Sequence, residues 1–203
     1  MDARFNPSQN EPFNMLPPGA FETSAQQRGY IHVYTGLGKG KTTASLGLTL
    51  RALGRGFRVL LIMFAKGGDH YGELFALRQL RPAIAARLTV VQAGLDRIVF
   101  SSNANAQDAE KMRYGWALAK RAAQGLQYDL LVMDEANIAL DLGFIDREEM
   151  LAFLCDKPPA LEIVLTGRRA HPDILAVADL VSDVQPLKHY WQQGVRARPG
   201  IEY

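Results

Sequence analysis

The sequence predicts an α/β fold in which a mostly parallel sheet is flanked by helices. Short strand-like segments alternate with helical segments along the chain, which is the first observation behind this prediction. These strand-like segments are also apolar throughout, as in parallel sheets that helices cover on both faces. The third observation is a glycine-rich loop that joins the first expected strand to the first expected helix.

The chain up to Pro82 is expected to form two strands and two helices. Residues 30–35 are β-branched and aromatic, which predicts a buried strand, and residues 42–53 place leucines at helical spacing before a glycine. Residues 57–64 form a second apolar run with the length of a strand. Residues 74–80 have a helical pattern, and we expect that helix to stop before Pro82.

The rest of the chain continues the alternation of strands and helices. Residues 88–92 and 128–133 are apolar runs that predict strands, and residues 108–124 between them have the pattern of a long amphipathic helix. Residues 146–155 are expected to form a helix with Asp146 as its N-cap. The last expected elements are a strand at residues 161–165, a helix at residues 172–177 and a strand at residues 180–184.

Composition places these elements in one compact domain. The chain has 203 residues and a formal net charge of +2, which is too small to indicate a nucleic-acid or membrane partner. We expect residues 1–28, which hold four prolines and no periodic pattern, to be a flexible N-terminal arm ahead of a domain at residues 29–203.

Cys155 is the only cysteine and is expected to be a buried small apolar residue. A single cysteine, together with no apolar run of spanning length and no secretory signal, predicts a cytoplasmic protein.

Polar residues follow several of the expected strands at the point where each strand ends. They are Thr35-Gly36, Lys66-Gly67, Asp134-Glu135 and Thr166-Gly167-Arg168. In open parallel sheets, ligands bind at the carboxyl ends of the strands, so these residues are expected to surround one site.

The glycine-rich loop predicts binding of ATP. Glycines let backbone N–H groups approach phosphates closely, and the start of the following helix adds partial positive charge. Lys41 supplies a full charge to the phosphates, and the hydroxyl of Thr42 is suited to Mg²⁺. The usual phosphate-loop pattern would place its first glycine at Thr35, whereas here it comes one residue later. The expected ATP-binding residues are Gly36, Leu37, Gly38, Lys39, Gly40, Lys41, Thr42 and Thr43, with Lys66 and Arg168 from later strand ends.

The acidic pair at residues 134 and 135 predicts a metal site beside this loop. An apolar strand ends in Asp134 and Glu135, and in phosphate-loop proteins a carboxylate at this place orders the metal directly or through water. Capping of the following segment is the alternative role for a strand-end aspartate. The expected metal ligands are Thr42, Glu135 and Asp134, and spacing alone does not decide between the two carboxylates.

The order of these segments resembles the ATP:corrinoid adenosyltransferases, a family with a modified phosphate loop. That loop typically reads Thr-Gly-Asn-Gly-Lys-Gly-Lys-Thr-Thr, which is similar to residues 35–43. Further similarity lies in the Lys-Gly at 66–67 with Gly-Glu at 72–73, the acidic pair, and Thr-Gly-Arg at 166–168. The C-terminal end also looks like the family's, from Lys188-His189 to Gly194-Val195-Arg196-Ala197-Arg198-Pro199-Gly200-Ile201-Glu202-Tyr203. The resemblance covers residues 29–203.

The resemblance implies a RecA-like phosphate-loop fold and a specific reaction. The 5′-deoxyadenosyl group of ATP passes to Co(I) of a reduced corrinoid and triphosphate leaves, in adenosylcobalamin biosynthesis or salvage. Lys41, Thr42 and Glu135 are the implied catalytic residues, with Mg²⁺ or Mn²⁺ on the phosphates. The family further implies a homodimer and a flavoprotein that reduces the corrinoid. Either complete cobalamin or a biosynthetic intermediate fits as the corrinoid.

The sequence departs from the family pattern in the proline-rich arm at residues 1–28, where relatives often have a charged helical lead, and at two further places. Leu37 stands where the family loop usually has asparagine, and no tryptophan accompanies Phe100 in the segment where relatives carry an aromatic pair over the corrinoid. Phe100, Lys188 and His189 are the candidate corrinoid-binding residues. The alternatives are an ordinary RecA-like ATPase or kinase, a nucleic-acid-binding relative, and an inactive ATP-dependent corrinoid carrier.

Overall fold

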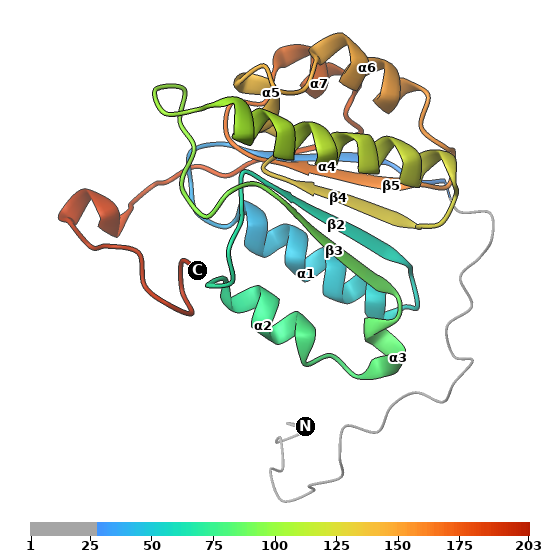
Figure 1. The fold of residues 1–203 in the computed structure, drawn as a ribbon, viewed down its shortest axis with the longest axis horizontal. Helices are drawn as coiled ribbons and strands as arrows, with labels where there is room; N and C mark the ends of the chain where they lie inside the picture. The colour runs from blue at the N-terminus through green and yellow to red at the C-terminus, as the bar shows by residue number, and fades with distance from the viewer. Residues whose placement is uncertain (1–27) are drawn as a thin grey trace, which may run out of the picture.

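The structure, a computed structural model, describes residues 28–203. The arm expected at residues 1–28 lies outside this part of the chain except for its last residue. The described residues form one six-stranded sheet in the order β3-β2-β4-β5-β1-β6, and every neighbouring pair is parallel (Figure 1). The predicted α/β fold with a parallel sheet flanked by helices is therefore confirmed.

The strands and helices alternate along the described chain. The strands are β1 (Ile31–Thr35), β2 (Val59–Phe64), β3 (Leu88–Ala93), β4 (Leu130–Asp134), β5 (Glu162–Thr166) and β6 (Leu180–Asp183). The helices are α1 (Lys41–Gly54), α2 (Gly72–Arg78), α3 (Pro82–Ala85), α4 (Ala106–Gln124), α5 (Ala136–Asp141), α6 (Arg147–Cys155), α7 (Pro172–Val177) and the 3₁₀ helix η1 (Tyr190–Gln193). Figure 1 shows α1, α2 and α3 on one face of the sheet and α4, α5, α6 and α7 on the other.

Two short helices and one side chain differ from the sequence-based expectations. The four-residue helix α3 begins at Pro82, which the sequence marked only as a stop, because proline is well suited to the first position of a helix. The six residues of α5 are too few to show a helical period. Cys155 is exposed rather than buried. It is the last residue of α6 and does not lie on the buried side of this helix, which is formed by Met150 and Leu154.

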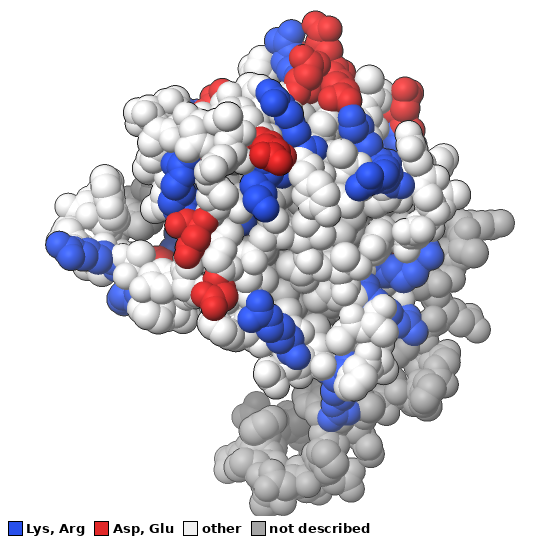
Figure 2. All heavy atoms as spheres, in the orientation of Figure 1, with Lys and Arg blue, Asp and Glu red and all other residues white. Residues whose placement is uncertain are grey.

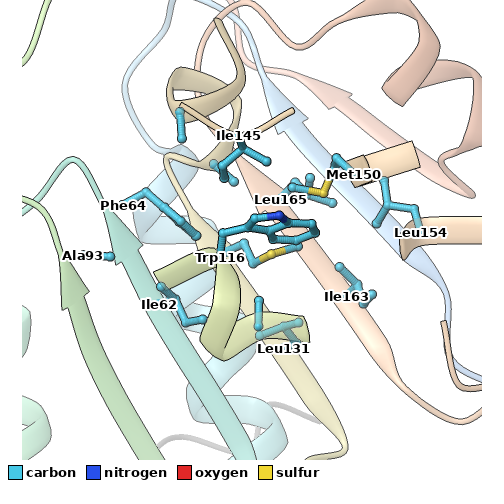
Figure 3. Packing of buried hydrophobic residues seen from close by; sticks show 14 of the residues in the cluster. Ile62, Phe64, Ala93, Trp116, Leu131, Ile145, Met150, Leu154, Ile163 and Leu165 are labelled. Atoms are coloured by element: carbon cyan, nitrogen blue, oxygen red, sulfur yellow. The ribbon is translucent and has the colours of Figure 1, made fainter. Parts of the chain in front are cut away.

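The larger of two cores lies between the sheet and the helices α4 to α7. Trp116 of α4 is buried in it, and its ring meets Phe153 of α6 edge to face at 5.0 Å between centroids. Figure 3 shows the indole at the centre of this cluster. The indole Nε1 donates to Glu149 Oε2 at 2.7 Å, so its polar atom is satisfied at the rim of the core. A capping box of Asn105 and Asp108 begins α4 and fixes where this helix enters the core.

We expect Gly115→Ala to destabilise the fold by about 1 to 3 kcal/mol, although alanine is the better helix former. Gly115 packs α4 against the sheet, and a Cβ there would lie 2.5 Å from Ala93 Cβ and 3.2 Å from Ile62 Cγ2. Gly47→Ala in α1 is the matched control, because a Cβ there meets nothing within 4 Å. Urea unfolding should show a gain of about 0.5 to 1 kcal/mol for the control. A stabilised Gly115 variant would contradict the packing described here.

The strand order brings the functional strand ends to one edge of the sheet. β5 lies between β1 and β4, so the end of β1 is separated from the end of β4 by one strand. Tyr34 is opposite Thr166, and Met133 is opposite Leu165, which places the ends of β1, β5 and β4 in one row. This row, the predicted place for a ligand, is the edge from which the loop before α1 extends.

The described surface carries charges of both signs. Figure 2 shows basic and acidic side chains interspersed on the face in view, without a continuous basic stripe. Between residues 28 and 203, no helix combines the length and the apolar character needed to cross a membrane.

Candidate nucleotide and metal site

The loop between β1 and α1 is arranged around the side chain of Lys41. Lys41 is the first residue of α1 and is buried, with its Nζ donating to Gly36 O at 2.8 Å and to Gly38 O at 2.6 Å. Burial lowers the pKa of Lys41, although the charge of Glu135 acts in the opposite direction. The ammonium therefore lies inside the loop where phosphate oxygens would replace the two carbonyls as its partners.

The far side of the loop rests on the chain that follows β6. The N–H of Gly38 donates to Val184 O at 2.7 Å. Gly36 has a φ of +98°, and a Cβ there would lie 2.3 Å from Asp183 Oδ1 and 2.5 Å from Val184 O. Glycine is thus needed here both for its backbone conformation and for the close approach of the next strand.

We expect Gly36→Ala to weaken ATP binding by about tenfold or more. The new Cβ must displace either the loop or the end of β6, and a strained backbone of this kind costs about 1 to 3 kcal/mol. Titration calorimetry with Mg-ATP measures the change. Gly143→Ala is the control, because Gly143 also has a positive φ but lies in a turn where a Cβ meets nothing within 4 Å. Equal ATP affinity in the Gly36 variant and the wild type would contradict the fit of this loop.

The other predicted loop residues point outward. Leu37, Lys39 and Thr43 are exposed. Lys39 Nζ donates to Ile201 O at 2.5 Å and lies 4.0 Å from Glu202 Oε1, so the C-terminal segment contacts the loop. The C-terminal end is therefore part of the site's surroundings.

A buried carboxylate joins the loop to three strands. Asp134 ends β4 and is fully buried; its Oδ1 accepts from Thr166 Oγ1 at 2.7 Å. Its Oδ2 accepts from Thr42 Oγ1 at 3.2 Å and from Lys66 Nζ at 2.6 Å. Lys66 Nζ also donates to Thr42 Oγ1 at 3.0 Å. Burial opposes the charge of Lys66, but the adjacent carboxylate outweighs it, so the pKa of Lys66 is raised.

Glu135 occupies a strained position next to this carboxylate. Its backbone is left-handed, with φ 60° and ψ 21°, and its N–H donates to Thr166 Oγ1 at 2.9 Å. Burial and the negative charge of Asp134 raise the pKa of Glu135, while Lys66 and Lys41 act to lower it. A non-glycine residue in this conformation costs about 1 to 3 kcal/mol and persists mostly at functional sites.

The oxygen donors fit a hard divalent cation. The hydroxyl of Thr42 and the carboxylates of Asp134 and Glu135 are ligands that Mg²⁺ and Mn²⁺ prefer. Residues 28–203 contain no cluster of three or more His, Cys, Asp or Glu side chains suited to a metal. A cation at this place would therefore take its remaining ligands from water and substrate phosphates, which is the usual arrangement for Mg²⁺ in nucleotide sites.

Arg168 lies at the same edge of the sheet, and a residue that the sequence did not indicate supports it. Arg168 is exposed, and its charge reaches the site, because it acts to lower the pKa of both Lys41 and Glu135. Asn137 is fully buried in α5, and its Nδ2 donates to Gly167 O at 3.1 Å. It therefore holds the turn that precedes Arg168. A single buried asparagine in a short helix leaves no pattern by which the sequence could reveal it.

The three candidate corrinoid residues come from two segments outside the phosphate loop, the loop after β3 and the segment before η1. Phe100 is 58% exposed in the loop after β3, and its N–H donates to Asn103 Oδ1. Lys188 is exposed, and His189 caps η1 by accepting from Trp191 N. Within residues 28–203, none of the three makes a hydrogen bond or ion pair with the phosphate loop. Figure 1 shows both segments at the edge of the sheet where the strands end.

The fold and site define a phosphate-loop protein of the α/β class, in which the lysine at the start of α1 lies inside the loop and the threonine after it contacts a strand-end aspartate. Residues 27–203 match the family described as ATP:corrinoid adenosyltransferase BtuR/CobO/CobP. The match spans most of the chain, and the chain belongs to this family.

Several named proteins are similar over most of the chain. A corrinoid adenosyltransferase of Escherichia coli K12 is 34% identical over 177 residues, which are 87% of each protein. The corrinoid adenosyltransferase CobA of Salmonella typhimurium is 34% identical over 178 residues, 88% of this chain and 87% of that protein. An uncharacterized protein of Nostoc is 35% identical over 180 residues, and this chain spans only 48% of its length.

Proposed function

We propose that this protein transfers the 5′-deoxyadenosyl group of ATP to Co(I) of a reduced corrinoid and releases triphosphate. The observation that carries the proposal is the contact of Thr42 with the buried Asp134 beside the enclosed Lys41 ammonium, in a chain of this family. Such a site can bind a triphosphate and stabilise the negative charge that develops on it as it leaves. Complete cobalamin and a late biosynthetic intermediate both fit as the acceptor.

The reaction balances without a general base. Co(I) donates an electron pair to the 5′-carbon of ATP, so a cobalt–carbon bond forms and cobalt becomes formally Co(III). The bond between that carbon and the triphosphate oxygen breaks, and its electron pair leaves with triphosphate. No proton is removed from the attacking cobalt, so the chain's task is to orient two substrates and stabilise the leaving group.

The site residues divide this task between them. Lys41 and the N–H groups of the loop bind the triphosphate, and Lys39 and Arg168 add charge from the exposed side. Thr42, Asp134 and Glu135 would hold Mg²⁺ or Mn²⁺, which withdraws charge from the phosphate oxygens when bound. Lys66 lies beside these residues, with its Nζ on Asp134 Oδ2.

Exposed apolar side chains at this edge suit the corrinoid face. Leu37, Phe100 and Trp191 are 57%, 58% and 73% exposed, so their apolar surfaces are accessible to a macrocycle. We assign corrinoid contact to Phe100, with Lys188 and His189 facing the polar rim of the macrocycle. Leu37 in place of asparagine adds apolar surface to the loop.

The proposal includes partners that the family implies. A flavoprotein would supply the electrons that reduce the corrinoid to Co(I), in the cytoplasm. Two copies of the chain would form a homodimer. Sedimentation of the purified full chain tests the dimer directly.

One experiment tests the proposed reaction. The protein is mixed with Mg-ATP and chemically reduced cob(I)alamin without air, and the loss of Co(I) absorbance is followed. We expect a photolabile corrinoid to form in amounts equal to the triphosphate released. Unchanged corrinoid in the presence of folded, ATP-binding protein would contradict the proposal.

ATP hydrolysis is a second candidate, and the place of Glu135 favours it. A carboxylate beside the phosphate site is the group that ordinary phosphate-loop ATPases use to orient water. Hydrolysis would release orthophosphate and would proceed without a corrinoid, so the phosphate product separates the two functions.

A further inference from the structure

The ammonium of Lys66 lies where a cation on Thr42 and Asp134 would lie. Its Nζ is 2.6 Å from Asp134 Oδ2 and 3.0 Å from Thr42 Oγ1, and those two oxygens are 3.2 Å apart. The side chain of Asp134 is 1% exposed and that of Lys66 is 16% exposed, so water screens this pair weakly. Lys66 thus neutralises the buried carboxylate.

Lys66 and a divalent cation are incompatible in this arrangement. A cation held by the same two oxygens would lie a few ångströms at most from Nζ, and two positive charges that close repel strongly in a weakly screened site. The hydroxyl of Thr42 also has few lone pairs to share between them. Lys41 differs, because its Nζ is bonded to the loop carbonyls and not to Asp134.

We propose that Lys66 is a resident counter-ion that keeps the metal site closed until the nucleotide arrives. The ammonium suppresses binding of free Mg²⁺ or Mn²⁺, and it leaves Asp134 when the cation enters together with the triphosphate. Phosphate oxygens then provide both the missing metal ligands and new partners for the displaced ammonium. This inference rests on the proposed function only for the identity of the nucleotide.

The test measures MnCl₂ binding to the full chain without ATP or corrinoid, from the electron paramagnetic resonance signal of free Mn²⁺. We expect Lys66→Met to bind Mn²⁺ at least tenfold more tightly than the wild type. Lys41→Met is the comparison, because it removes a nearby charge whose ammonium is hydrogen-bonded to the loop carbonyls and not to Asp134, and its gain should be smaller than that of Lys66→Met. Lys66→Gln keeps a hydrogen-bond donor for Asp134 without the charge and should show the same gain in Mn²⁺ affinity. It replaces the methionine variant in this test if that variant folds poorly.

Two results would overturn the proposal. Equal Mn²⁺ affinity in the Lys66 variants and the wild type would show that the ammonium does not occupy the metal position. An equal gain in Lys41→Met would show that the effect is general electrostatics. Because neither measurement involves adenosyl transfer, the outcome is independent of whether the proposed reaction is correct.

Discussion

Lys41→Met is expected to lower the rate of adenosyl transfer by about a hundredfold to a thousandfold, the usual loss when one donor to a developing negative charge is removed. The Lys41 ammonium is enclosed by the loop, and its hydrogen-bond partners among residues 28–203 are two backbone carbonyls, so it is poised for phosphate oxygens. Methionine fills similar space without charge or donor. Anaerobic single-turnover kinetics with cob(I)alamin, together with ATP calorimetry, separates loss of chemistry from loss of binding.

Arg121→Met is the control for the Lys41 experiment. Arg121 is exposed in the last turn of α4, beyond Gly115, where the helix packs on the last residues of β2 and β3, and its replacement should leave the rate unchanged. If the Lys41 variant retains more than a tenth of the wild-type rate, the phosphate loop does not have the catalytic role proposed here.

Asp134→Asn is expected to destabilise the protein by about 3 to 5 kcal/mol, because it leaves the Lys66 ammonium partly buried without its counter-ion. The fully buried carboxylate accepts hydrogen bonds from Thr42, Lys66 and Thr166, and asparagine cannot accept all three. The free energy of unfolding from urea titration measures the loss. Adenosyl transfer should fall as well, since the same carboxylate is a proposed metal ligand.

A surface ion pair provides the control for this prediction. Asp129 is paired with Arg58 at 2.8 Å, and their side chains are 34% and 50% exposed. Asp129 also accepts from the backbone N–H and Nε of Arg58, so Asp129→Asn should cost about 1 to 2 kcal/mol, less than the buried replacement. Similar losses for Asp134→Asn and Asp129→Asn would show that the buried network contributes no more than an exposed pair.

The sequence was sufficient to predict the sheet and the residues at its carboxyl edge. Each apolar run became a strand, and β2, β4 and β5 are buried as expected for runs between two layers of helices, whereas the edge strand β6 is exposed. Lys66, Asp134 and Thr166 were expected near one another since parallel strands end at one edge. The glycine-rich loop likewise required a strand before it and a helix after it, and both are present.

The contacts between side chains within the site could not be predicted from the sequence. Lys66 and Asp134 are 68 residues apart, and only their register in neighbouring strands brings Nζ to Oδ2. Asn137 escaped notice because α5 is too short to show a period. The partners of Lys39 come from the far C-terminal end, which no local pattern links to the loop.

In the proposed reaction, the 5′-carbon of ATP becomes bonded to cobalt. ATP labelled with ¹³C at this carbon is mixed with the protein, Mg²⁺ and cob(I)alamin without air, and the ¹³C spectrum is recorded in the dark. We expect the resonance of an oxygen-bonded carbon to be replaced by that of a cobalt-bonded carbon, which disappears on exposure to light. If the label stays bonded to oxygen while orthophosphate accumulates, the protein hydrolyses ATP and the account of adenosyl transfer is wrong.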